Sequence, residues 1–149
     1  MLPALFLSLI VAGPSAAKAT VDKPMIEQAP QPAAPPPTIV QRVRDAIGQN
    51  DFVKAEKLVL DDLAVNGNTP IAIEAFSWLG RGAVAAKNYG AAMTYAARTY
   101  EIVEEQLKTR KLDAEPRLPI ALGAAIEVTA LATAGQGGRS DAVLYLRRE

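Results

Sequence analysis

The chain has 149 residues, the length of one domain with tails, and its 16 basic and 16 acidic residues give a formal net charge of zero. This balance excludes the strongly basic surface that is typical of proteins that bind nucleic acid. The sequence contains no Cys and no His, so it lacks the groups for a structural zinc site, thiol catalysis or a Ser-His-Asp triad. We therefore predict no metal, no cofactor and no catalytic residue in this chain.

The first 19 residues have the pattern of an export signal. Leu2 to Ala12 are almost wholly apolar, and this run is short for a membrane span, which needs roughly 20 residues, but typical of the core of a signal peptide. Ala17-Lys18-Ala19 fits the cleavage pattern, so residues 1–19 are predicted to be a signal peptide cut after Ala17 or after Ala19. No Lys or Arg precedes the apolar run, so either the signal is atypical or the start of the reading frame is missing. The alternative to a cleaved signal peptide is an uncleaved N-terminal anchor. Both alternatives predict an exported protein, periplasmic or extracellular, and cleavage would leave no membrane span.

Residues 20–37 are rich in proline and contain Pro24, Pro30, Pro32, Pro35, Pro36 and Pro37. Proline fixes φ and lacks a backbone donor, so a segment of this composition forms neither a regular helix nor a central strand. We predict a disordered, semi-rigid linker between the export signal and a folded domain over residues 38–149. The alternative is a proline-rich recognition peptide.

From Thr38 onward apolar residues recur at helical spacing, and no segment alternates apolar with polar residues as a strand would. The predicted fold class is therefore all-α, a helical hairpin array of about six helices. The first helix runs from Thr38 to about Gln49, and Asp51, Thr69-Pro70 and Asn88 mark the next three starts. A fifth helix covers about 118–134 and a last one starts after Ser140. On the third helix one face is predicted to carry Ile73, Phe76, Gly80, Ala83 and Lys87.

The turns before the second, fourth and sixth helices share a pattern that indicates a repeat. Each is followed at a fixed step by a small residue inside the next helix, which is Ala55, Ala92 or Ala142. Residues 76–92 are similar to the tetratricopeptide repeat (TPR), a helix–turn–helix unit of ~34 residues. Phe76, Leu79-Gly80, Tyr89 and Ala92 carry the match, whereas Ala83 stands where that repeat usually has Tyr. The resemblance implies stacked helix pairs, in which small residues allow close helix packing.

A second resemblance covers about residues 50–149. The runs 76–82 (FSWLGRG), 118–128 (LPIALGAAIEV) and 141–149 (DAVLYLRRE) are similar to a helical region that precedes a thioredoxin-fold domain in secreted bacterial proteins of the TlpA type. In that family the redox chemistry belongs to a downstream Cys-x-x-Cys. The resemblance implies that this chain is the N-terminal part of a longer thiol–disulfide oxidoreductase. The last helix has no stop signal before Glu149, so the domain is expected to be truncated at its C-terminus.

Three local features could have a catalytic or binding role, but for each of them an ordinary structural role is preferred. Asp61-Asp62 and Glu104-Glu105 are paired carboxylates, but they lie on charged helix faces typical of solvated surfaces. Trp78 is the only Trp; it is expected in the core, with a partner anchor as the alternative. The stretch 135–138 lacks the Lys and Ser/Thr of a phosphate-binding loop and is expected to end a helix.

The remaining candidate site is a groove that binds a protein or peptide. In helix-pair arrays of this kind the first helix of each pair lines one face, and the repeat register assigns to it Arg44, Glu74, Ser77, Arg81 and Glu127. The alternative is that these are ordinary surface residues. The sequence thus predicts a non-catalytic extracytoplasmic TPR-like scaffold, whose partner is a protein, a peptide or a downstream thioredoxin-like domain. The alternatives are a free-standing periplasmic peptide-binding or oligomerisation adaptor, and an independent enzyme that uses carboxylates.

Overall fold

The first four helices along the described chain, residues 35–149 of this computed structural model, begin at polar capping side chains. Thr38 and Gln41 form a capping box, in which the Thr38 N–H donates to Gln41 Oε1 at 2.7 Å. Asp51 and Asn88 accept from backbone N–H groups three residues further on, and Thr69 caps the helix that begins at Pro70. The helices are α1 (Ile39–Gly48), α2 (Phe52–Asn66), α3 (Pro70–Ala85), α4 (Tyr89–Leu107), α5 (Arg117–Gly135) and α6 (Arg139–Arg148), with a 3-10 turn η1 (Leu112–Ala114).

These bounds confirm the all-α prediction, and the described part of the chain contains no strand. The last helix begins at Arg139, slightly before the predicted start after Ser140, because Gly138 ends the preceding turn and no side chain caps α6. The predicted signal peptide over 1–19 and nearly all of the predicted linker over 20–37 lie outside the described residues.

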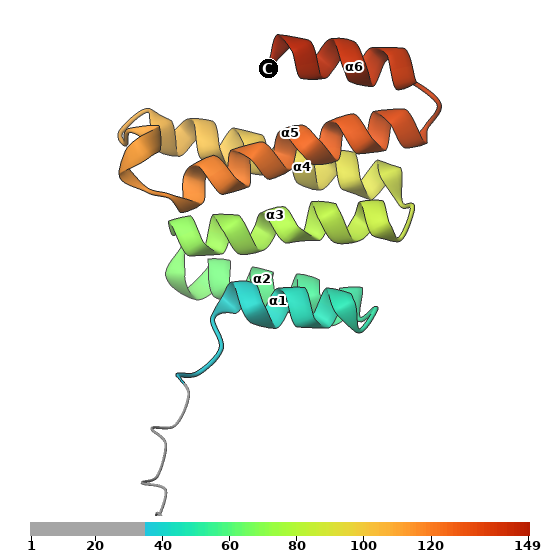
Figure 1. Cartoon of the computed structure of the whole chain (residues 1–149). Helices are drawn as coiled ribbons and strands as arrows, with labels where there is room; N and C mark the ends of the chain where they lie inside the picture. The colour runs from blue at the N-terminus through green and yellow to red at the C-terminus, as the bar shows by residue number, and fades with distance from the viewer. Residues whose placement is uncertain (1–34) are drawn as a thin grey trace, which may run out of the picture. The chain divides into compact units, whose positions relative to one another are not determined.

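The six helices form three antiparallel pairs that stack on one another. α1 packs on α2, α3 on α4 and α5 on α6, while α3 also packs on α1 and α2, and α5 also packs on α3 and α4. Figure 1 shows α1, α3 and α5 one above the other in one layer, with α2 and α4 behind them. Successive odd-numbered helices therefore run in the same direction and touch, which places side chains of all three pairs on one face.

The same left-handed turn joins the two helices of every pair. Its turn residue has a positive φ, of 58° at Asn50, 57° at Lys87 and 100° at Gly137. The next residue donates its N–H to a carbonyl in the last turn of the helix, for example Asn88 to Ala83 at 2.8 Å, as in a Schellman motif. Five residues after each turn residue stands a buried alanine, which is Ala55, Ala92 or Ala142. The three pairs therefore share one register counted from this turn.

The turn also corrects one predicted position. Lys87 was predicted to lie on the same face of the third helix as Ile73, Phe76, Gly80 and Ala83, but α3 ends at Ala85 and Lys87 is exposed in the left-handed turn. The other four members of that face are buried. Residues other than Gly, Asn and Asp rarely adopt this left-handed backbone conformation, because their Cβ atom comes too close to the following carbonyl oxygen.

Replacing Lys87 by glycine is therefore expected to stabilise the fold. We expect Lys87→Gly to raise the free energy of unfolding by about 0.5–1 kcal/mol, since relief of the left-handed strain exceeds the entropy that glycine adds to the unfolded chain. The neighbouring Ala86 has a φ of −77°, so Ala86→Gly serves as the control and should lower stability. Urea denaturation of both variants measures the difference, and a loss of stability in Lys87→Gly would contradict the account.

Small residues bring the stacked pairs close together. A Cβ placed on Gly80 of α3 would lie 3.2 Å from Val128 Cγ1 of α5 and 3.7 Å from Tyr95 Cβ of α4. α5 is long and apolar enough, by length and composition, to cross a membrane. Here it packs against α3, α4 and α6, and Leu118, Val128 and five of its six alanines are buried.

Candidate functional site

One exposed face of the array carries an aromatic ring and two cationic groups from neighbouring helices. Trp78 of α3 is partly buried against the core formed by α1, α2 and α3. The Arg44 guanidinium carbon, from α1, lies 4.6 Å from the Trp78 ring centroid, and that of Arg81 lies 4.8 Å away. Both distances are those of cation–π contacts, which hold a guanidinium against a ring while leaving it able to donate hydrogen bonds.

Arg81 also reaches the next odd-numbered helix. Its Nε and Nη2 atoms donate to Glu127 Oε2 of α5 at 2.9 Å and 2.7 Å. The side chains of Arg81 and Glu127 are 28% and 49% exposed, so solvent weakens the pair and its contribution to stability is small. Its structural effect is to fix the direction of Arg81. We call Arg44, Trp78, Arg81 and Glu127 together the Trp78 face.

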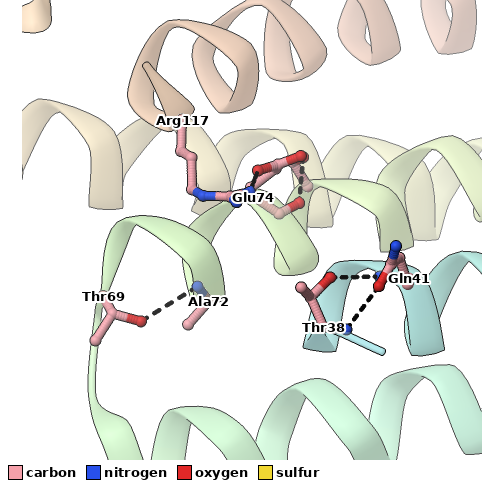
Figure 2. Close-up of polar contacts among 7 residues, drawn as sticks. Thr38, Gln41, Thr69, Ala72, Glu74 and Arg117 are labelled. Carbon is pink, nitrogen blue, oxygen red and sulfur yellow. Dashed lines mark hydrogen bonds and ion pairs between the residues drawn. The ribbon is translucent and has the colours of Figure 1, made fainter. Parts of the chain in front are cut away.

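Two of the five predicted groove residues do not lie on this face. Glu74 is 8% exposed and Ser77 is 2% exposed, because α3 is covered by helices on several sides. Glu74 forms an ion pair with Arg117 at the start of α5, which Figure 2 shows beside the capping residues of α1 and α3. The Ser77 hydroxyl donates to the Glu74 carbonyl oxygen at 2.7 Å. The prediction that Glu74 and Ser77 line an open groove is therefore wrong.

The sequence interpretation missed two contributors to these contacts. Arg117 lies just before the predicted fifth helix of about 118–134, and nothing in the sequence links it to Glu74, which lies 43 residues away. Trp78 was expected in the core, and the structure places only part of it there. The available signal was helical spacing, because Trp78 and Arg81 lie three residues apart on one face of α3.

A second cross-pair contact lies around Tyr95 of α4. Its hydroxyl donates to Glu56 Oε1 of α2 at 2.6 Å, and its ring centroid lies 5.8 Å from that of Phe52 and 5.7 Å from that of Phe76. Burial, followed by the hydrogen bond and charge of Glu56, raises the pKa of Tyr95 from 10.0 to about 12. The fold thus disfavours the ionised phenolate.

This shift predicts how stability depends on alkaline pH. Below pH 10 the phenol of Tyr95 is protonated in both folded and unfolded chains, so its contribution is complete. Above pH 10 the unfolded chain ionises first, and stability is lost until the pH reaches the folded pKa of about 12. Tyr95→Phe should be less stable than the wild type at pH 8 but lose less stability between pH 10 and 12. Urea denaturation across this range checks it, and parallel losses in both proteins would contradict the assignment.

One carboxylate of each pair that was predicted to be solvated contacts a neighbouring cation, whereas Asp62 is only partly exposed and accepts from Asn66 Nδ2 at 3.0 Å. Asp61 pairs with Lys57 at 2.8 Å, and Glu105 pairs with Lys108. Within residues 35–149 no group of three or more His, Cys, Asp or Glu side chains is arranged to hold a metal ion. Among these groups the Trp78 face has the chemistry to bind a ligand, because two guanidiniums beside an indole ring suit a carboxylate next to an apolar side chain.

No protein-family model, curated protein or solved structure matches this chain significantly.

Proposed function

We propose that residues 38–149 are a non-catalytic, TPR-like interaction module of an exported protein. The stacking of three helix pairs in one register supports this function, because such stacking builds a continuous face from the odd-numbered helices. The observation that carries the proposal is the contact of Arg44 and Arg81 with the ring of Trp78 on that face. Its ligand is an extended peptide that bears a carboxylate and a neighbouring apolar side chain.

The exported character rests on the sequence pattern of residues 1–37 and the likeness to TlpA-type proteins. We further propose that the module forms the N-terminal part of a thiol–disulfide oxidoreductase and positions or feeds a thioredoxin-like domain. The alternative, a free-standing adaptor, would use the same face. The sequence downstream of Glu149 therefore distinguishes the adaptor from the oxidoreductase. A Cys-x-x-Cys within about 150 residues after Glu149, the size of one domain, supports the oxidoreductase, and its absence from that stretch contradicts it.

Trp78 gives a direct assay of the face because it is the only tryptophan in the chain. A short peptide that alternates Glu with Phe is titrated into the protein and followed by tryptophan fluorescence, with a Lys-for-Glu peptide as the matched probe. We expect the acidic peptide to change the emission and bind more tightly than the basic one. Arg44→Gln should weaken binding about fivefold, the value of one charged contact of about 1 kcal/mol.

Arg42 provides the matched control, since it is an exposed arginine on the same helix and is not among the cations that contact Trp78. Arg42→Gln should leave the affinity for the acidic peptide unchanged. Equal binding of the two peptides, or equal effects of the two substitutions, would show that the Trp78 face is not a binding site.

A further inference from the structure

The shared turn allows positions to be compared between the three pairs. Six residues before each turn residue stand Arg44, Arg81 and Leu131 on the odd-numbered helices. On the even-numbered helices, six residues after it stand Glu56, Met93 and Val143, and nine residues after it stand Val59, Ala96 and Leu146. Each set occupies one register position. Its members should therefore contact the next helix pair in the same way wherever such a pair is present.

In the first two pairs these positions contact the pair that follows. Arg44 lies over Trp78 of α3, and Arg81 bonds to Glu127 of α5. Glu56 accepts from Tyr95 of α4. Val59 is buried in one cluster with Ala75, Phe76 and Leu79 of α3. Ala96 is buried in another cluster with Val128 and Ala132 of α5, and Met93 packs against this second cluster. Side chains at all three positions therefore contact the next helix pair in the stack.

In the third pair the same positions are apolar and uncovered within residues 35–149. Leu131, Val143 and Leu146 are 47%, 49% and 52% exposed, and the adjoining Leu144 is 61% exposed. Arg139 and Arg147 flank Val143 and Leu144 around a shallow hollow on the outer side of α6, and neither arginine forms an ion pair in this part of the chain. We call these six residues the end surface.

We propose that the end surface binds an amphipathic helix of a partner protein, with an apolar stripe flanked by acidic side chains. A helix is indicated because helices cover the equivalent positions of the first two pairs. Acidic flanks are indicated because Arg139 and Arg147 would otherwise be placed beside the docked helix without a counter-charge. The inference goes beyond the proposed function, since it concerns a surface separate from the Trp78 face.

A second copy of this chain is a poorer occupant. At the other end of the array, Arg42, Asp45 and Asp62 stand where the second pair has Leu79, Gly82 and Thr99. Stacking that charged end onto the apolar end surface would bury polar groups without partners. Pairing two α6 helices about a two-fold axis would instead bring the arginines of both copies together.

The test uses the full chain and two designed helical peptides with the same leucine stripe, one flanked by Glu and the other by Lys. Binding is measured by fluorescence anisotropy of labelled peptide. We expect the Glu-flanked peptide to bind at least about tenfold more tightly, and Val143→Asp with Leu146→Asp to lower its affinity by about tenfold. Val65→Asp, at a valine that is 82% exposed on α2, is the matched control and should have no effect.

A charge exchange keeps the proposal testable if the aspartate variant folds poorly. Arg139→Glu with Arg147→Glu should reverse the preference and favour the Lys-flanked peptide. Equal binding of both peptides, an unchanged preference in this variant, or a further helix pair encoded after Glu149 that covers the end surface would overturn the proposal. A chain that sediments as a dimer and becomes monomeric with Val143→Asp, or that binds anionic vesicles instead of either peptide, would assign the surface to a second copy or to a membrane. Trp78 fluorescence reports the other face, so failure here leaves the proposed function to its own assay.

Discussion

Leu79→Ala is expected to lower the free energy of unfolding by about 3 kcal/mol, within the range of 2–5 kcal/mol found for buried leucines. Leu79 has no solvent exposure and belongs to the core that α1, α2 and α3 form together. Truncation removes apolar contacts and leaves a cavity between α3 and its neighbours. The stacked pairs on both sides of α3 prevent the surrounding side chains from filling this cavity. Small domains are stable by only about 5–15 kcal/mol, so this single change should clearly lower the midpoint of urea unfolding.

Leu60→Ala is the matched control, because Leu60 is also helical but 51% exposed on α2. The same chemical change there should alter stability by less than about 1 kcal/mol. Similar losses in the two variants would mean that α3 is not the centre of the packing.

Arg117→Met is expected to destabilise the protein by about 2 kcal/mol, more than Glu74→Gln does. The Glu74 side chain is 11% exposed and that of Arg117 is 39% exposed. Removal of the arginine leaves a buried carboxylate without its counter-ion, whereas removal of the carboxylate leaves an arginine that can turn toward water. We set the loss below the 3–5 kcal/mol of fully buried pairs because the arginine is partly solvated.

A double-mutant cycle isolates this pair from other effects. Glu74→Met combined with Arg117→Met should be more stable than Arg117→Met alone, because no unpaired charge remains in the packed region. Chemical denaturation of the four proteins gives the coupling energy. Losses that add without coupling would show that the contact between α3 and α5 does not depend on this pair.

The helix starts could be predicted because short-range polar signals determine them. Thr38, Asp51, Thr69 and Asn88 cap helices through bonds to residues three positions away, so a short window of sequence contains all the information. The spacing of small residues after each turn likewise indicated the helix pairs. Turn conformation was harder to predict, since Lys87 carries no sequence signal for a positive φ.

The candidate site depends on contacts between helices, which local patterns do not specify. Arg81 and Glu127 lie 46 residues apart; the repeat register assigned both to one face, and their side chains form an ion pair. The same register placed Glu74 and Ser77 there, although packing of α5 and its Arg117 against α3 buries Glu74. Sequence patterns therefore identified the face but not which of its positions the neighbouring helix covers.

Site-specific photo-crosslinking beside Arg44 tests the interaction function most directly. A photoreactive side chain replaces Gly48, an exposed residue one helical turn after Arg44 on α1, so that Arg44 and Trp78 are both kept. Val65 on α2, which is also exposed, carries the photoreactive side chain in the control. In the cell that produces the protein, we predict a discrete protein adduct from position 48 that is lowered by Trp78→Ala and absent from position 65. No adduct from position 48, or the same adducts from both positions, would contradict an interaction function.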